Sequence, residues 1–406
     1  MSSDRIFSAV LASPGEDARV LLSSRKMAAL DGIRGLAILL VLVSHIYRFM
    51  PPNNPIIKAV HIMFAYGGSG VSLFFVLSGF LITGILLDTR HAANYFTSFY
   101  MRRVLRIFPL YYAVLIVVLL GMHYFYPWLS PGAANRKLFF LYVSNWVVLW
   151  KGTWNPNYIW HFWSLAVEEQ FYVLWPLCVW LLTPANLRRV AIGAFPVALG
   201  WRLYSVLRYG PSPAVANATI SHVDALLAGA LCALVVRDCA ALIPVRRWLP
   251  LTSIVTLGSC LTVLLLLHDN SSRMWSFYQT AGLSLMAIGF AALILHTAIT
   301  DRCPVAVQRV FTWRTLTQFG KYSYGIYVYH LPLIGLLEIQ VYAKLPQHVK
   351  DSVGFGLAYF AFLIALSYFI AKLSYEKFER PMLDLKRHFK ARIAATPNGA
   401  DTHDGD

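Results

Sequence analysis

Charge is scarce in this sequence, and one sign predominates. Of the 406 residues only 13% are charged, whereas 58% are hydrophobic and 15% are aromatic. A soluble domain cannot bury that much apolar surface, so the composition excludes an ordinary soluble protein and predicts an integral membrane protein. The 35 Lys and Arg exceed the 19 Asp and Glu, which in a soluble chain would suggest nucleic-acid binding. Because the basic residues lie between apolar runs, the positive-inside rule explains them, and we expect no nucleic-acid partner.

Metal-ligand and leader patterns are also lacking. The five cysteines lie singly in or beside apolar runs, with no CxxC pair and no histidine cluster at metal spacing, so we interpret them as packing residues and expect no metal. The N-terminal residues to Lys26 lack a basic segment followed by an apolar core and a small-residue cleavage site. This excludes a cleavable signal peptide and predicts a cytoplasmic N-terminal tail over residues 1–29.

Long apolar runs are what the sequence does contain. Runs of about 17–25 residues predict about ten membrane spans, at approximately 33–50, 62–87, 107–126, 163–182, 190–207, 221–237, 249–268, 275–296, 322–341 and 353–374. An even number of spans and the distribution of Lys and Arg place both termini in the cytoplasm. We therefore expect an all-α polytopic protein with one transmembrane domain over residues 30–381. A polar cytoplasmic tail without order is expected over residues 382–406.

One further apolar stretch, residues 138–150, is too short to span, at about 13 residues. Counting it as a span would also put later basic loops on the wrong side. It is rich in tryptophan, which suits the membrane boundary, and we interpret it as an external re-entrant or interfacial segment. A simple aromatic belt is the alternative.

Residues 30–45 predict a helix that enters the membrane with Arg34 near its start and carries His45 inside it. Ionisable groups within a span are expensive, so a functional role is the default interpretation. Eleven positions at about 100° each bring His45 to within roughly 20° of the face of Arg34, about 16 Å further along the axis. One face of this helix therefore carries both groups.

Two other polar patterns stand near span ends. Arg103 and Arg106 are three residues apart before the third span and so share a helix face. They suit phosphate binding, but enforcing topology or meeting lipid headgroups explains them equally well. Glu168 and Glu169 lie one turn inside the external start of a predicted helix. Only one of the two needs to face a cavity, because adjacent residues point in different directions, and a pair between one carboxylate and His45 is possible.

Some polar or small residues favour a structural interpretation. Gly70, Ser78 and Gly79 in the second span are typical of close helix packing. His330, alone in an apolar span two residues before Pro332, is more often a satisfied interhelical hydrogen bonder than a catalytic group.

Taken together, six segments resemble the membrane-bound acyltransferase-3 family: residues 30–45, 70–81, 100–112, 163–176, 322–332 and 375–381. In that family a basic residue followed by ten residues and a histidine, and an Arg-x-x-Arg pattern before the third helix, are the functional signatures. Both occur here, as Arg34 with His45 and as Arg103 with Arg106. The resemblance implies a protein of the bacterial inner membrane that moves an acyl group, most often acetyl, from acyl-coenzyme A to a hydroxyl of a sugar or glycan. Some relatives carry an extra hydrolase-like domain, which this sequence lacks, so a stand-alone transferase is expected.

The resemblance also suggests roles for residues. His45 would act as general base or as a transient acyl carrier. Glu168 would orient its imidazole, as the third member of a triad does. Arg103 and Arg106 would hold the coenzyme A phosphates, and Arg34 would grip the donor arm or stabilise the oxyanion.

Two rival functions remain at this point. A proton-coupled solute or glycan transporter also uses intramembrane His, Arg and Glu, although no inverted repeat is evident. A structural scaffold fits poorly with buried ionisable groups.

Overall fold

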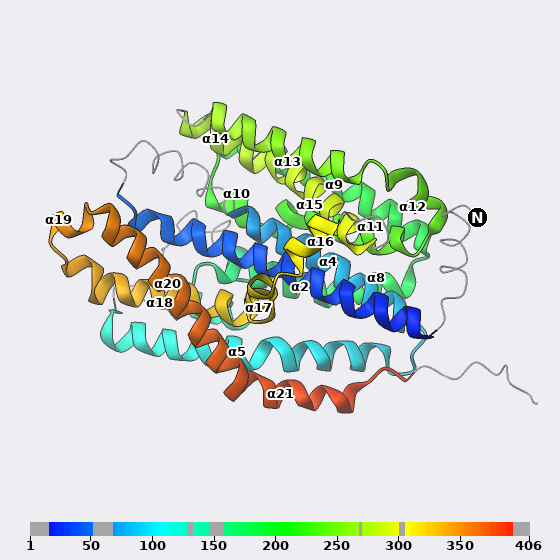
Figure 1. Cartoon of the computed structure of the whole chain (residues 1–406), viewed down its shortest axis with the longest axis horizontal. Helices are drawn as coiled ribbons and strands as arrows, with labels where there is room; N and C mark the ends of the chain where they lie inside the picture. Colours follow the sequence, from blue (N-terminus) through cyan, green and yellow to red (C-terminus); the bar gives the residue numbers. More distant parts are fainter. Residues whose placement is uncertain are drawn as a thin grey trace, which may run out of the picture.

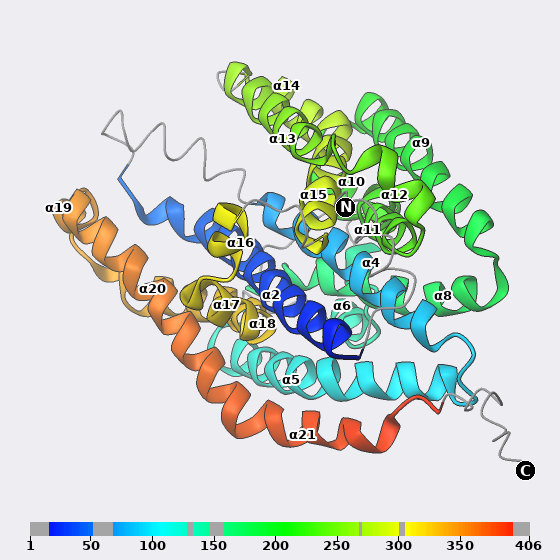
Figure 2. The same ribbon diagram turned by 45° about the vertical axis from the view of Figure 1, so that its right-hand side comes forward.

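The computed structural model describes residues 16–51, 68–127, 133–146, 158–267, 270–299 and 305–392. Within these ranges the chain is a bundle of helices without a strand. Most of the long helices run along the long axis of the molecule, with α5 and α21 on one flank and α13 and α14 on the opposite flank (Figures 1 and 2). The predicted all-α polytopic architecture is confirmed.

The helices have the following bounds. The first half of the chain contains α2 (Glu16–Ile46), η1 (Tyr47–Phe49), α4 (Ser69–Thr89), α5 (Tyr95–Phe125), α6 (Ala133–Phe140), α8 (Phe162–Leu181) and α9 (Pro184–Tyr209). The middle contains α10 (Pro213–Asn217), η4 (Thr219–His222), α11 (Val223–Val236), α12 (Cys239–Val245), α13 (Leu249–Leu266), α14 (Ser271–Phe277), η5 (Tyr278–Gly282) and α15 (Leu283–Ala298). The last part contains α16 (Val305–Phe311), α17 (Arg314–Lys321), α18 (Ser323–Gln340), η6 (Tyr342–Lys344), α19 (Gln347–Lys350), α20 (Val353–Ser374), η7 (Tyr375–Glu379), α21 (Arg380–Asp384) and η8 (Leu385–Phe389).

Nine helical segments in the described ranges are long and apolar enough to cross a membrane. α8 also has 20 residues but is less apolar, because two glutamates and a glutamine interrupt it. Together these ten segments correspond one for one to the predicted spans. The second begins at Ser69, later than predicted, and residues 62–67 of the prediction lie outside the described ranges.

Ion pairs and hydrogen bonds identify the two ends of the bundle. At the end that we call proximal, Asp88 pairs with Arg237 at 2.7 Å and Arg90 donates to the Trp180 carbonyl at 3.0 Å. At the opposite, distal end, Arg48 pairs with Glu338 at 2.6 Å. These contacts join helix ends that the predicted alternation of spans places on the same side.

The third span is longer than predicted. The sequence places Arg103 and Arg106 in a segment before a span at 107–126, whereas α5 is one helix from Tyr95 to Phe125 with Pro109 inside it. Both arginines therefore lie on the same continuous helix as the third span. This rigid placement decides where their side chains point.

The short apolar stretch at 138–150 does not span in its described part. α6 ends at Phe140, and the chain then turns at Tyr142, whose φ is 52°. Gln170 of α8 donates to the Tyr142 carbonyl at 2.8 Å and to Asn145 at 3.0 Å, which ties the turn to α8. Residues 147–157, with the rest of the predicted segment, lie outside the described ranges.

α4 and α11 cross at main-chain contact. A Cβ on Gly79 would lie 1.8 Å from the Leu226 carbonyl oxygen, and one on Gly229 would lie 1.9 Å from the Val76 carbonyl oxygen. Only glycine permits this approach, as in other membrane helix pairs with small residues at the interface. The packing role predicted for Gly79 fits this geometry.

Gly79→Val is therefore expected to prevent assembly of the bundle, since two helix backbones would have to separate. The measurement is the yield of monodisperse protein in size-exclusion chromatography after detergent extraction. Gly121→Val on α5 is the control, because no heavy atom lies within 4 Å of the added Cβ there. A wild-type yield for Gly79→Val would contradict the crossing.

α2 makes a similar contact with the α17 region. The Cβ of any other residue at Gly35 would lie 1.9 Å from the Leu316 carbonyl oxygen, and at Gly320 it would lie 1.7 Å from that of Asp31. This close contact holds the part of α2 around Gly35 at a fixed distance from α17. Arg34, the neighbour of Gly35, is positioned by it.

The chain after the last span is ordered further than predicted. Residues 382–392 were expected to lack order, but α21 and η8 follow α5 closely (Figure 2). Ser98 donates to the Phe389 carbonyl at 2.8 Å and Asn94 to the Lys390 carbonyl at 2.9 Å, while Asn94 accepts from the Arg392 amide at 2.8 Å. Polar composition suggested disorder, but here Asn94, just before α5, and Ser98, on α5, form hydrogen bonds with the segment's main chain. Residues 393–406 lie outside the described ranges.

Candidate functional site

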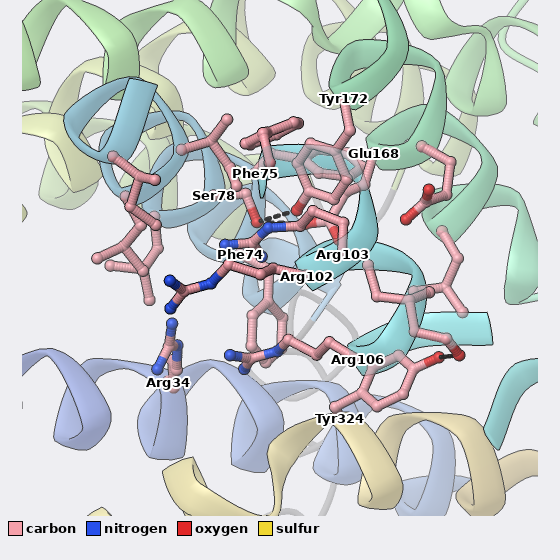
Figure 3. A pocket seen from close by; sticks show the side chains of 18 of the residues that line it. Arg34, Phe74, Phe75, Ser78, Arg102, Arg103, Arg106, Glu168, Tyr172 and Tyr324 are labelled. Atoms are coloured by element: carbon pink, nitrogen blue, oxygen red, sulfur yellow. Dashed lines mark hydrogen bonds between the residues drawn. The ribbon is translucent and has the colours of Figure 1, made fainter. Parts of the chain in front are cut away.

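A cavity of about 580 Å³ lies among α2, α4, α5, α8 and α18 (Figure 3). Its charged lining consists of five cations, Arg34, Arg102, Arg103, Arg106 and Lys386, and three carboxylates, Asp88, Glu168 and Glu169. The remaining lining is largely apolar and aromatic. It is thus a mostly apolar chamber with a strongly basic wall, the kind of setting in which a few polar groups orient a ligand.

The basic wall is assembled from three parts of the chain. Arg103 and Arg106 come from the same face of α5, Arg34 comes from α2, and Lys386 comes from the segment after α20. Figure 3 shows the guanidinium groups of Arg34, Arg103 and Arg106 turned toward the same space. The sequence predicted the first three as a binding set, but it missed Lys386, which lay in the tail that was expected to be disordered.

Local contacts hold these side chains in place. Arg34 pairs with Asp31 one turn earlier at 2.8 Å. The Arg103 guanidinium carbon lies 5.7 Å from the ring centre of Tyr172 and 5.9 Å from that of Phe99. Within the described ranges neither Arg103 nor Arg106 forms an ion pair with a carboxylate within 4.0 Å. Their charge is therefore free to meet an anion.

The acidic side of the cavity is organised by Ser78. Its hydroxyl donates to Glu168 at 2.6 Å and accepts from the Tyr172 hydroxyl at 3.1 Å. Ser78 therefore has a polar role besides the packing role that the sequence suggested. Glu169 also lines the cavity, whereas the sequence required only one carboxylate of the pair to do so.

His45 lies apart from this cavity lining, further toward the distal end of α2. Its Nδ1 is 2.8 Å from the Val41 carbonyl oxygen. Its ring lies 5.5 Å from the ring of Trp160 and 5.1 Å from that of His330.

The expected pairing of Glu168 with His45 is not formed. Glu168 is turned toward α4, where Ser78 holds it, and the Val41 carbonyl orients the His45 ring instead. The predicted topology placed both residues in the outer half of the membrane, but it could not give the rotation of α8 relative to α2. Arg34, Arg103, Arg106 and Glu168 are thus brought together in the cavity, and His45 is not.

No group of three His, Cys, Asp or Glu arranged to hold a metal ion occurs in the described ranges. The cavity offers carboxylates, hydroxyls and a set of arginines, and the imidazole of His45 lies outside its lining. These groups suit anion binding, proton transfer and oxyanion stabilisation.

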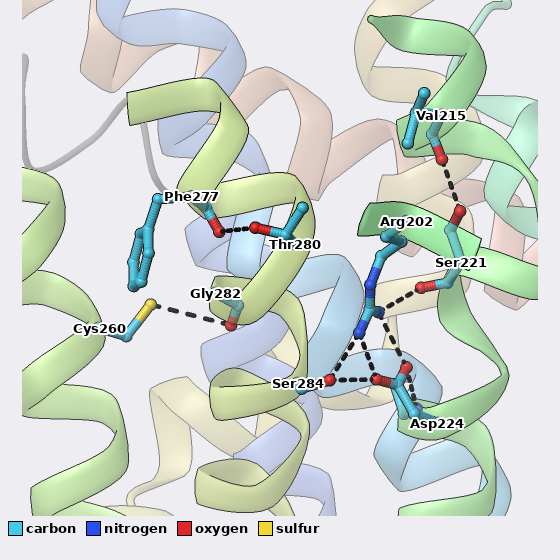
Figure 4. A network of polar contacts seen from close by, with 10 residues as sticks. Arg202, Val215, Ser221, Asp224, Cys260, Phe277, Thr280, Gly282 and Ser284 are labelled. Atoms are coloured by element: carbon cyan, nitrogen blue, oxygen red, sulfur yellow. Dashed lines mark hydrogen bonds and ion pairs between the residues drawn. The ribbon is translucent and has the colours of Figure 1, made fainter. Parts of the chain in front are cut away.

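A second buried polar network lies elsewhere in the bundle (Figure 4). Arg202 of α9 and Asp224 of α11 are 0% and 1% exposed and pair at 2.8 Å. Arg202 also donates to the Ser221 carbonyl at 2.7 Å, and the Ser284 hydroxyl donates to Asp224 at 2.7 Å. Each charge has its partners inside the network and neither lines the basic cavity, so we assign it to the fold rather than to chemistry.

Outside the spans, one ion pair at the proximal end has a clear electrostatic effect. Arg188 donates to Asp238 at 2.5 Å, and this hydrogen bond holds the pKa of Asp238 below its ordinary value. The pair links the start of α9 to the start of α12. It does not contribute to the cavity.

Comparison with known proteins places this architecture. A family model described as an acyltransferase domain matches residues 27–372. The chain is 27% identical over 382 residues to "Peptidoglycan O-acetyltransferase OatA" of Listeria monocytogenes, which covers 89% of this chain and 56% of that protein. It is 28% identical to "Putative peptidoglycan O-acetyltransferase YrhL" of Bacillus subtilis, over 88% of this chain and 55% of that protein. It is 26% identical to "O-acetyltransferase OatA" of Staphylococcus aureus, over 91% and 59%.

The chain therefore spans little more than half the length of these curated relatives. No solved structure matches it significantly. The transporter alternative gains no support from these comparisons.

Proposed function

The chain belongs to the acyltransferase-3 family, and from that premise we propose that it transfers an acetyl group from acetyl-coenzyme A to a hydroxyl of a cell-wall glycan. The observation that carries the proposal is the basic wall of the cavity. Arg103 and Arg106 are free of carboxylate partners there and stand on one helix face, so their guanidiniums suit phosphate oxygens. Coenzyme A, with phosphates at one end and a thin thioester arm at the other, has the corresponding distribution of charge. Other acyl-coenzyme A donors have the same anionic end.

The donor would enter from the proximal end, which we propose to be cytoplasmic in a bacterial inner membrane. Arg102 and Lys386 would add to the phosphate site, and Arg34 would meet the arm deeper in the bundle. The apolar lining would then hold the thioester in a water-poor space. Such a space strengthens the electrostatic effect of Arg34 on a developing oxyanion.

His45 is proposed as the general base. A carbonyl oxygen can only accept, so the hydrogen of the neutral ring lies on Nδ1, toward Val41, and Nε2 carries the lone pair. Nε2 would take the proton of the acceptor hydroxyl as its oxygen bonds to the acyl carbon. The carbon–sulfur bond breaks, and the leaving thiolate recovers the proton. Glu168, which Ser78 holds, would balance the charge of the arginines in the cavity.

The donor site is tested with Arg103→Ala and Arg106→Ala in nanodiscs. Free thiol release from acetyl-coenzyme A is measured with a peptidoglycan disaccharide as acceptor. Each variant is expected to raise the KM for acetyl-coenzyme A by about tenfold or more, because a hydrogen bond to a charged group contributes about 1.5–3 kcal/mol.

Arg189→Ala is the matched control, since Arg189 is exposed at the start of α9 and does not line the cavity. It is expected to keep the wild-type KM. Wild-type protein that neither binds acetyl-coenzyme A nor releases thiol would contradict the proposed function. An unchanged KM in both arginine variants would contradict the phosphate site.

A further inference from the structure

Three histidines from separate helices form a cluster toward the distal end. His45 comes from α2, His161 from the residue that precedes α8, and His330 from α18. The rings of His45 and His330 are 5.1 Å apart and those of His161 and His330 are 4.8 Å apart. His161 and His330 are 1% and 0% exposed, while His45 is only partly buried. The cluster is therefore closed around two of its rings and open at His45.

Backbone carbonyls fix the tautomer of each ring in its neutral form. The Tyr327 carbonyl lies 2.7 Å from His330 Nδ1 and 3.0 Å from His161 Nε2, and the Val41 carbonyl holds His45 Nδ1. Since a carbonyl oxygen only accepts, each of these nitrogens carries the hydrogen. The lone pairs are then on His45 Nε2, His330 Nε2 and His161 Nδ1.

Two of these lone pairs lack a donor. His330 Nε2 and His161 Nδ1 are buried, and neither has a hydrogen-bond partner within the described ranges. Buried acceptors without donors are costly, and such atoms in native structures call for an explanation. A metal ion does not provide one, because the described residues form no group of three ligands that could hold it. O–H donors that reach the cluster through its open side at His45, from a ligand or from ordered water, would satisfy both.

Aromatic rings border the cluster. The Trp160 ring lies 5.5 Å from that of His45, and the Tyr327 ring lies 5.5 Å from that of His330 and 5.2 Å from that of His161. A sugar residue combines hydroxyls on its edge with apolar C–H faces. Acceptor nitrogens beside flat apolar rings match both of these features.

Tyr327 links the cluster to the donor cavity. Its side chain lines the cavity, and its hydroxyl donates to the His161 carbonyl at 2.9 Å. The Ser164 hydroxyl, 2.5 Å from that of Tyr327, lines the cavity as well. His161 and His330 therefore contact a residue that also lines the space assigned to the thioester.

We propose that His161 and His330 form the subsite that holds the acceptor sugar, by accepting hydrogen bonds from hydroxyls next to the one that is acylated. His45 takes the proton of the reacting hydroxyl. His161 and His330 are positioning residues: they orient the sugar and take no part in making or breaking bonds. The acceptor class is a sugar with neighbouring free hydroxyls rather than a simple alcohol. This inference rests on the proposed function, because it locates the second substrate of that reaction.

The test uses amide side chains that mimic one ring nitrogen at a time. Asparagine places its polar atoms near the Nδ1 position of histidine, and glutamine places them near Nε2. At position 330 the required lone pair is on Nε2, so His330→Gln should keep acceptor binding and His330→Asn should lose it. At position 161 the lone pair is on Nδ1, so the order reverses, with His161→Asn active and His161→Gln impaired.

Each impaired variant is expected to raise the KM for a peptidoglycan disaccharide by about tenfold, the effect of one lost hydrogen bond. The KM for acetyl-coenzyme A and thiol release without acceptor should stay at wild-type values. A structural role for the rings would not produce opposite orders at the two positions. Size-exclusion profiles and melting temperatures of all four variants show whether each one folds.

The outcomes separate the two proposals. If wild-type protein releases thiol and acetylates the disaccharide but the Gln and Asn variants act alike, the subsite is overturned, and ordered water satisfies the two nitrogens. If wild-type protein shows neither reaction, the proposed function fails and this inference fails with it. The subsite is supported if His330→Gln and His161→Asn keep acceptor binding while His330→Asn and His161→Gln lose it, with the kinetics for acetyl-coenzyme A unchanged.

Discussion

Replacing His45 by alanine is expected to slow acyl transfer by about 10²–10⁴-fold, the usual contribution of a positioned general base. The binding constant for acetyl-coenzyme A should not change, because His45 does not line the basic cavity. The measurement pairs acetyl-coenzyme A binding by calorimetry with transfer to a peptidoglycan disaccharide in nanodiscs. Loss of transfer with intact binding places His45 in the chemical step.

Two variants sharpen this result. His45→Gln keeps a hydrogen-bond acceptor near Nε2 but not a base, so it should be as slow as alanine. His348→Ala is the matched control, since His348 is exposed on α19 toward the same distal end as His45. Transfer within tenfold of wild type in His45→Ala would contradict the role of His45 as base.

Asp224→Asn is expected to destabilise the folded protein by about 3–5 kcal/mol. Removing one member of a buried ion pair leaves the other charge without compensation, and Arg202 is fully buried. Unfolding in detergent, followed by tryptophan fluorescence against temperature or denaturant, measures the loss. Because the network lies away from the cavity, the folded fraction should keep the wild-type KM for acetyl-coenzyme A.

An exposed pair provides the comparison. Asp88 and Arg237 are 63% and 36% exposed, so Asp88→Asn should cost about 1 kcal/mol or less. The double variant Arg202→Met with Asp224→Leu should recover part of the stability that Asp224→Asn loses, because no buried charge remains. Equal stability of Asp224→Asn and Asp88→Asn would show that Arg202 has another partner for its charge.

Much of the fold was predictable because long apolar runs are a strong local signal. The ten predicted spans each have a counterpart, from α2 to α20. Boundaries were less predictable, since the third span was expected to begin at residue 107, after Arg103 and Arg106, whereas α5 already begins at Tyr95. The guanidinium of an arginine on a membrane helix can point into a polar cavity, and a hydropathy profile does not detect such an orientation.

The site was predictable only in part. Spacing along one helix placed Arg103 and Arg106 together, and both line the cavity, whereas of Arg34 and His45 only Arg34 does. The relation between helices was not encoded there, so the pairing of Glu168 with His45 failed and the contact between Ser78 and Glu168 was missed. His330 was judged a satisfied residue, yet its Nε2 has no partner in the described ranges. A lone histidine carries no signal of where the other helices place their donors.

The glycine crossings bear on which acyl groups the chamber can admit. At Gly79 and at Gly35 main chain meets main chain, and each of these residues is next to one that lines the cavity, Ser78 and Arg34. Helices in such contact cannot move closer together, and moving them apart would break the main-chain packing at the glycines. Under the proposed function, room for a longer acyl chain must therefore come from replacing lining residues such as Phe74 or Ile82 by smaller ones. Proteins of this architecture would then differ in the acyl-chain length that they prefer through single substitutions in the cavity lining, while the helix packing stays the same.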